Sequence, residues 1–253
     1  MSGVAPRTAW VDALRGVAVV WMIGYHFCFD LNWYGWARWQ MLADPFWTVQ
    51  RASIVSLFMF TAGLSQALAW RGGQTAAAFG RRWAQVAGCA VLVSASSYVS
   101  FPQTWIYFGV LHAFALMWLL TRALKSLSLG PWAWAVLGVL IWSSAWWVPA
   151  GLHDAAWQTW FNAPPGNVLG WVSHKPHTED YAPLAPWWGV MLLGVAVGAW
   201  WWSRERSAWS GWRGEGALSR VVRFMGRHSL LVYMLHQPLM LAGFELAEVL
   251  AAV

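Results

Sequence analysis

The sequence predicts an all-α membrane protein, a polytopic bundle of about seven transmembrane helices. Hydrophobic residues make up 59% of the 253 residues and charged residues only 10%, whereas a typical soluble domain is ~45–50% apolar and ~25% charged. The mean hydropathy is +0.44, and 25 residues are Trp. This composition excludes a disordered chain, which would be more polar and more charged.

Seven mostly apolar runs approach the ~20 residues that a helix needs to cross a bilayer. Trp and Tyr gather at their ends, notably at 33–39 and 200–202, which is typical of membrane interfaces. The first run is too long for a signal peptide and no small-residue cleavage site follows it, so we expect it to remain as a helix. We expect residues 1–253 to form a single integral membrane domain with spans at Trp10–Leu31, Thr48–Trp70, Trp83–Ser100, Trp105–Ala123, Trp132–Val148, Pro183–Trp202 and His228–Leu250.

The basic residues predict the orientation of these spans. Of the 16 Lys and Arg residues, only Arg38, Arg51 and Lys175 lie in the odd connections, and all others lie near the N-terminus or in the even connections. The positive-inside rule then places the N-terminus in the cytoplasm and the C-terminus outside. Membrane orientation therefore accounts for the net charge of +6, and we expect no nucleic-acid partner.

Two connections are long enough to have roles of their own. The outer segment at about 149–182 is either a solvated loop or a lid that binds an acceptor. The inner segment at about 203–227 is predicted to be a basic linker near anionic lipid headgroups. Gly194 and Gly198 form a small-xxx-small pair, which favours close helix packing. Cys28 and Cys89 lie inside apolar runs and are interpreted as small core residues rather than a disulfide or metal pair.

Four ionisable residues share one stripe of the first run. At ~100° per residue, Asp12 and Asp30 are a whole number of turns apart, and His26 lies only ~20° from the line through Arg15. Ionisable groups in hydrocarbon are costly and usually face a bundle interior or a water-filled cavity. As alternatives, Asp12 and Arg15 could snorkel or pair with each other near the inner end, and Asp30 could simply end the helix.

His26 is the strongest catalytic candidate in this stripe. It lies well inside the span, and Asp30 is one helical turn away, where a carboxylate can fix the imidazole tautomer and stabilise the imidazolium. We interpret His26 as a general base and Asp30 as its partner; the alternative is a packed core histidine. Arg15 lies ~16 Å away along the axis, a spacing that suits an extended anionic cofactor entering from the cytoplasm.

Two further histidines, His112 and His236, fall at a similar depth in a ~30 Å hydrocarbon core. Three histidines at one level could bind zinc, but no spacing such as HxxxH or HExxH occurs. We therefore expect a shared polar cavity near the middle of the membrane and no metal ion.

Seven blocks of the sequence carry a resemblance to a known family. The blocks are DALRG at 12–16, MIGYHF at 22–27, FTAGLS at 60–65, IYFGVLH at 106–112, DYAPL at 180–184, GRHSL at 226–230 and YMLHQP at 233–238. They resemble the small bacterial relatives of the heparan-alpha-glucosaminide N-acetyltransferase catalytic domain, and the resemblance covers nearly the whole chain. A second pattern, Arg15 followed ten residues later by His26, is similar to the Arg-x10-His pattern of membrane acyltransferases that decorate surface polysaccharides.

The resemblance implies transfer of an acetyl group from cytoplasmic acetyl-CoA to a sugar on the far side of a bacterial inner membrane. His26 corresponds to the catalytic histidine through the second pattern. The acceptor, whether an amine or a hydroxyl, and the oligomeric state, including a homo-oligomer, stay open. The candidates for contact with the acceptor are His112, Asp180, His236 and Gln237.

In this hypothesis the CoA phosphates meet cations on the inner side. The start of the last helix adds a helix N-terminus, which is a ready anion site. The candidates for CoA binding are Arg15, Arg81, Arg82, Arg227, His228 and Ser229. A proton-coupled transporter or channel is the first alternative, although no inverted repeat is visible. The second alternative is a structural or regulatory membrane subunit.

Overall fold

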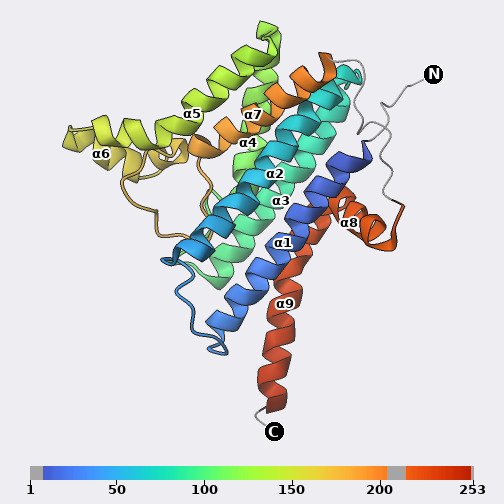
Figure 1. Cartoon of the computed structure of the whole chain (residues 1–253). Coiled ribbons are helices and arrows are strands. Elements are labelled where there is room, and N and C mark those ends of the chain that lie inside the picture. The colour runs from blue at the N-terminus through green and yellow to red at the C-terminus, as the bar shows by residue number, and fades with distance from the viewer. Residues whose placement is uncertain (1–7, 204–214, 252–253) are drawn as a thin grey trace. The chain divides into compact units, whose positions relative to one another are not determined.

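The computed structural model describes residues 8–203 and 215–251, and in this part of the chain every regular element is a helix. The all-α fold class is therefore confirmed. In chain order the helices are α1 (Ala9–Trp33), α2 (Pro45–Arg71), α3 (Ala76–Ser100), α4 (Val110–Leu124), the 3-10 turn η1 (Lys125–Leu127), α5 (Pro131–Gly151), α6 (Ala155–Asn162), the 3-10 turn η2 (Gly166–Leu169), α7 (Leu184–Ser203), α8 (Ala217–Arg227) and α9 (Ser229–Ala251) (Figure 1).

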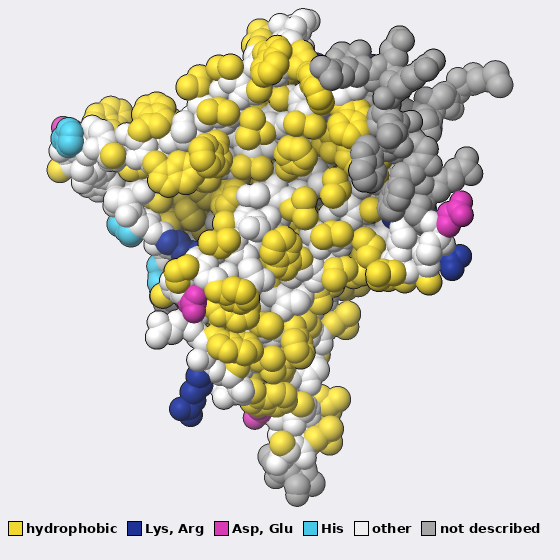
Figure 2. Space-filling model, in the orientation of Figure 1, with side chains coloured by type: hydrophobic (Ala, Val, Ile, Leu, Met, Phe, Trp, Pro, Cys, Tyr) yellow, Lys and Arg dark blue, Asp and Glu magenta, His cyan; other side chains and the backbone are white. Residues whose placement is uncertain are grey.

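Six helices of the described chain are long and apolar enough to cross a membrane, which makes this a multi-pass membrane protein. They are α1, α2, α4 with η1, α5, α7 and α9. Hydrophobic side chains accordingly cover most of the surface that the long helices present in Figure 2. Helix α3 is also long enough, with 25 residues at ~1.5 Å each, but Gln85 and several serines lower its hydropathy.

The contacts divide the chain into two compact units. Among the described residues, unit 1 runs from 59 to 203, and unit 2 combines 8–58 with 215–251. Helix α2 contributes to both units, because its residues up to Phe58 belong to unit 2 and those from Met59 onward belong to unit 1.

Small residues allow α2 and α7 to pack closely in unit 1. A Cβ atom added to Gly63 would collide with the backbone oxygen of Met191, and one added to Gly194 would collide with that of Phe60. At Gly198 an added Cβ would lie 2.7 Å from the Cβ atom of Ala67. The close packing predicted from Gly194 and Gly198 is confirmed, and α7 runs parallel to α2.

The directions of the helices indicate that α3 also crosses the membrane. In unit 1, α2 and α7 run parallel. Two parallel helices in one membrane must be separated along the chain by an odd number of membrane crossings, and α3, α4 and α5 supply three. In unit 2, Asp12 contacts Arg227 near the start of α1, whereas Tyr34, just after α1, bonds Glu245. Helices α1 and α9 are therefore parallel as well, which requires an odd number of crossings between them, and α2, α3, α4, α5 and α7 supply five. Both pairs support α3 as the seventh span.

The structure differs from the sequence prediction mainly at the connections. Helix α4 begins at Val110 rather than near Trp105, because Gly109 is extended and serves as its N-cap. The outer segment contains α6 and η2, and the Asp154 side chain caps α6 by accepting hydrogen bonds from the backbone of Ala156 and Trp157. The expected basic linker is partly helical: α8 fills its second half, while residues 204–214 lie outside the described residues.

The close contact between α2 and α7 makes Gly194 sensitive to substitution. Gly194→Ala should lower the free energy of unfolding by about 1–3 kcal/mol, the usual cost of overpacking a core site. The control is Gly88→Ala in α3, where nothing lies within 4 Å of an added Cβ atom. That change should be neutral or stabilising, because Ala is favoured over Gly inside a helix. Thermal unfolding of both purified variants tests the prediction, and a Gly194→Ala protein as stable as the wild type would contradict it.

Candidate functional site

A cluster of four polar side chains connects α1 and α9 in unit 2. The rings of His26 and His236 lie edge to face, with centroids 5.0 Å apart. One turn beyond His26, the Oδ1 atom of Asp30 accepts a hydrogen bond of 2.7 Å from Nε2 of Gln237. Because Asp30 is only 2% exposed, its carboxyl group is held inside the protein. The structure thus brings together four of the residues predicted from the sequence.

Gln237 is the hydrogen-bond partner of Asp30 on α9. Its Nε2 atom donates to Asp30, while its Oε1 atom is buried without a partner among the described residues. In the described part of the chain Asp30 makes no hydrogen bond to His26, although the two residues share a helix face. The carboxyl group of Asp30 is therefore held by α9 rather than by the imidazole one turn away.

The backbone of α9 fixes the tautomer of His236. Its Nδ1 atom lies 2.7 Å from the carbonyl oxygen of Tyr233, so Nδ1 carries the proton and donates it to that oxygen. Nε2 is then left as an acceptor, and it is buried without a hydrogen-bond partner in the described structure. Pro238 follows this segment and removes one N–H group from the helix ladder.

The cluster presents unmatched acceptors. Asp30 Oδ2 and Gln237 Oε1 are also buried without hydrogen-bond partners among the described residues. Buried polar atoms are normally paired, and unpaired ones commonly mark functional positions or bound molecules. With two imidazoles beside these atoms, the site can accept a proton and hold a hydroxyl or amine group.

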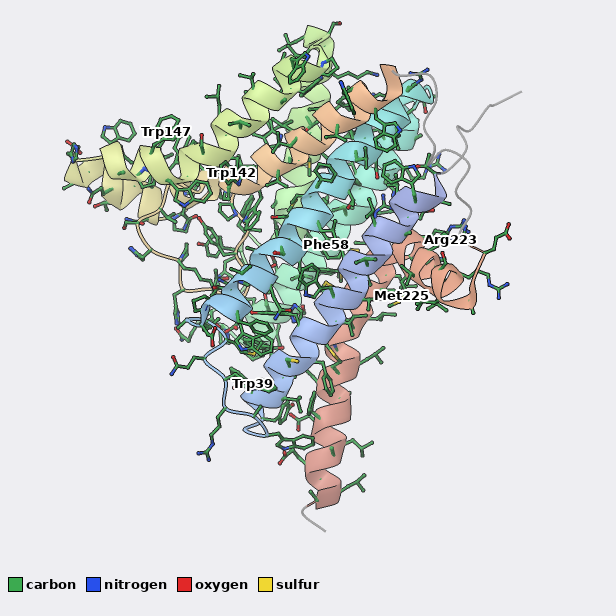
Figure 3. The ribbon with its side chains drawn as sticks, in the orientation of Figure 1. Trp39, Phe58, Trp142, Trp147, Arg223 and Met225 are labelled. Carbon is green, nitrogen blue, oxygen red and sulfur yellow. The ribbon has the colours of Figure 1, made fainter. Side chains whose placement is uncertain are left out.

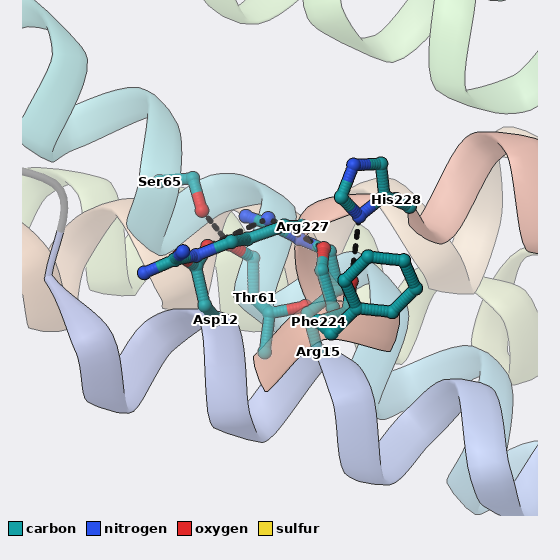
Figure 4. A network of polar contacts seen from close by, with 8 residues as sticks. Asp12, Arg15, Thr61, Ser65, Phe224, Arg227 and His228 are labelled. Atoms are coloured by element: carbon teal, nitrogen blue, oxygen red, sulfur yellow. Dashed lines mark hydrogen bonds and ion pairs between the residues drawn. The ribbon is translucent and has the colours of Figure 1, made fainter. Parts of the chain in front are cut away.

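A second cluster lies at the start of the same helices (Figure 4). Buried Asp12 pairs with two cations: its Oδ1 atom lies 3.4 Å from Nη1 of Arg15, and its Oδ2 atom lies 3.2 Å from Nε of Arg227. Arg15 also donates to the carbonyl oxygen of Gly226. The pairing of Asp12 with Arg15, one of the alternatives from the sequence, is confirmed, and one positive charge remains in excess.

The junction between α8 and α9 lies beside these cations. His228 joins the two helices. Its ring is tilted against the Phe224 ring, with centroids 4.3 Å apart, and its Nδ1 atom lies 2.9 Å from the Phe224 carbonyl oxygen. Ser229 is the first residue of α9. A helix N-terminus carries a partial positive charge, so Arg15, Arg227, His228 and Ser229 together form a local anion-attracting surface.

Unit 1 holds the remaining predicted residues. His112 is bonded on both ring nitrogens, since Nδ1 accepts from the Gly109 N–H group and Nε2 lies 2.9 Å from Oγ of Ser94. Asp180 accepts a hydrogen bond of 2.7 Å from the Val110 N–H group at the start of α4. Arg81 and Arg82 are exposed near the start of α3. His112 and Asp180 thus organise the entry into α4, and their contact with an acceptor stays a prediction.

The sequence analysis missed a buried polar group in the outer segment. Asn167, fully buried in η2, donates from Nδ2 to the Tyr107 hydroxyl, and the Tyr181 hydroxyl donates to the Asn167 carbonyl oxygen. Burial raises the pKa of both phenols, so both remain neutral. The Asn167 Oδ1 atom has no hydrogen-bond partner in the described structure. The only signal in the sequence was a tyrosine in each of two blocks already noted, at 106–112 and 180–184.

Metal ligands are not gathered in either unit. Over residues 8–203 and 215–251, no group of three or more His, Cys, Asp or Glu side chains is placed to hold a metal ion. Cys28 and Cys89 are free, partly buried thiols.

Comparison with known families places this site in a chemical class. The model of the family described as heparan-alpha-glucosaminide N-acetyltransferase, catalytic, matches residues 7–238, from the start of α1 to just beyond His236 and Gln237. Neither the curated proteins nor the solved structures contain a significant match. Since the match covers most of the chain and the family implies acyltransferase activity in general, the chain belongs to the heparan-alpha-glucosaminide N-acetyltransferase catalytic family.

Proposed function

We propose that the protein transfers an acyl group, most simply acetyl, from cytoplasmic acyl-CoA to a sugar or another acceptor on the outer side of a bacterial inner membrane. The observation that carries the proposal is the His26–His236 pair, with Asp30 and Gln237 beside it, on two helices long enough to cross a membrane. Family membership supports acyl transfer in general. The identity of the donor, the acceptor and the direction of transfer belong to the proposal.

Acyl transfer requires one general base beside the reacting atoms. His26 takes the proton from the acceptor hydroxyl or amine as its oxygen or nitrogen attacks the thioester carbonyl carbon. The C–S bond then breaks, and the departing sulfur takes the proton back from the imidazolium. The negative charge of Asp30, one helical turn away, favours the charged imidazolium. The free acceptor atoms of Gln237 and His236 hold the attacking group in place.

The donor phosphates are proposed to bind at the start of α1. Arg15 and Arg227 supply two positive charges against one carboxylate, and the N-terminus of α9 adds its dipole. Arg15 lies ~16 Å along the helix from His26, a distance that an extended pantetheine arm can cover. Arg81 and Arg82 are further candidates for contact with the phosphates.

The direction of transfer rests on the distribution of basic residues. Placing the basic connections in the cytoplasm puts the cation cluster on the donor side. The parallel course of α1 and α9 supports an arrangement in which the C-terminus emerges on the outer side. His112 and Asp180 are then candidates for contact with the acceptor.

A pair of single cysteines at the two ends of α5 tests the orientation. In a Cys28→Ala, Cys89→Ala background, His153→Cys should react with an impermeant maleimide added to intact cells. Ser126→Cys, in η1 shortly before the start of α5, should react only after the membrane is broken. Both positions are exposed, and His153 is preferred to Asp154 because Asp154 caps α6. The reverse labelling pattern would refute the proposed direction of transfer.

His26→Ala should lower kcat at least about a hundredfold, since general-base catalysis contributes ~10²–10⁴ in rate. Donor binding should remain nearly normal, because the imidazole acts on the acceptor rather than on the phosphates. The matched control is Cys28→Ala, which removes a small side chain two positions along α1 and should retain activity. Transfer of labelled acetyl groups and binding of labelled acetyl-CoA are measured on the same preparations. A His26→Ala protein that binds acetyl-CoA and transfers at the normal rate would leave His26 as a packing residue.

Loss of a donor-side arginine should weaken binding of acetyl-CoA about tenfold to a hundredfold, because a charge-assisted contact contributes roughly 1.5–3 kcal/mol. The variants are Arg15→Ala, Arg81→Ala and Arg82→Ala. A fourth variant, Arg15→Lys, retains a positive charge to pair with buried Asp12. Arg51→Ala, at an exposed position near the start of α2, serves as the control. Equilibrium binding of labelled acetyl-CoA measures the effect, and unchanged affinity in all three variants would place the donor site elsewhere.

A further inference from the structure

Helix α8 is fixed to α1 along one face. An added Cβ atom at Gly226 would collide with the backbone oxygen of Asp12, and one at Gly16 would collide with that of Val222. The two backbones are therefore in direct contact at the start of α1. Beyond this contact α8 turns away from α1 and α9 (Figure 1).

The side chains of α8 separate into two further faces. Arg220, Arg223 and Arg227 follow one another at spacings of three and four residues, so they share one side of the helix. Arg223 and Met225, labelled in Figure 3, are two positions apart, which at ~100° per residue places them on opposite sides. The helix contains no acidic residue.

An apolar stripe runs beside the arginines and is left uncovered. Leu218, Val221 and Phe224 recur every three residues and are 78%, 56% and 60% exposed. A row of large exposed apolar side chains is costly in water, and it is favourable when the helix lies in the plane of a membrane interface. A small soluble anion would make use of the arginines but not of this stripe.

The arginines are available to an anion. Arg227 is paired with Asp12, but within the described chain Arg220 and Arg223 make no ion pair. The Nε atom of Arg223 is also buried without a hydrogen-bond partner among these residues. The face therefore offers positive charge next to apolar side chains.

We propose that α8 is an in-plane helix that binds anionic phospholipid. Arg220 and Arg223 contact the lipid phosphate groups, and Leu218, Val221 and Phe224 insert among the acyl chains. Because α8 and α1 are in backbone contact, bound lipid stabilises the start of α1 against unfolding. The proposal is independent of the reaction, since neither Arg220 nor Arg223 is assigned to catalysis or to donor binding.

Thermal unfolding of the full chain in lipid nanodiscs tests this interaction. The wild type should unfold at a higher temperature in an equimolar mixture of phosphatidylglycerol and phosphatidylcholine than in phosphatidylcholine alone. The expected increase is roughly 2–4 °C for each arginine engaged. Arg220→Gln with Arg223→Gln should abolish the difference, and Arg220→Lys with Arg223→Lys should retain most of it. The control pair Arg38→Gln with Arg51→Gln should leave it unchanged.

Two further measurements on the wild-type protein identify the ligand, and they do not depend on the folding of any variant. High salt should reduce the phosphatidylglycerol effect on the wild type, because screening weakens contacts between exposed charges. Inorganic pyrophosphate added to phosphatidylcholine nanodiscs should have little effect. A full effect of pyrophosphate would indicate a soluble-anion site and overturn the proposal. Three other results would also overturn the proposal. The increase in unfolding temperature with phosphatidylglycerol could be insensitive to salt, could persist in the Arg220→Gln, Arg223→Gln variant, or could disappear equally in the Arg38→Gln, Arg51→Gln control.

Discussion

Polar side chains placed inside hydrocarbon need partners, and the pairing of α1 with α9 depends on meeting that requirement. Asp30 is buried, and Gln237 satisfies one of its oxygens from the other helix. Further toward the start of α1, Asp12 is held by Arg15 and Arg227. An unpaired charge buried in this way would cost several kcal/mol. These contacts hold the two helices in register, and the same register sets His26 beside His236.

Close backbone approach is the second means by which the helices are positioned. Glycines at the α1–α8 and α2–α7 contacts remove the side chains that would separate the helices. In a bilayer the lipid chains are as apolar as the helix surfaces, so tight packing rather than exclusion of water favours association. The cation cluster thus rests on the contact between α1 and α8 that Gly16 and Gly226 make possible.

Most of the fold could be predicted because hydropathy and length directly reflect the thickness of the membrane. Helix α8 could not, because its arginines lower the average hydropathy of a segment that is apolar on one side only. The position of His26 was predictable from helical periodicity. The hydrogen bonding of Asp30 was not, because a shared helix face does not determine which rotamer a carboxylate adopts. Its actual partner, Gln237, is 207 residues away in the sequence.

That long separation has a consequence for how the protein is made. Ribosomes add ~5–20 residues per second, so roughly 10–40 s pass between the synthesis of Asp30 and that of Gln237. During this interval α1 has emerged without the helix that completes its polar cluster. The histidine pair can assemble only after nearly all of the described chain has been translated and inserted. An unfinished polypeptide therefore lacks the assembled pair, and the timing of translation itself separates the insertion of α1 from the completion of its polar cluster.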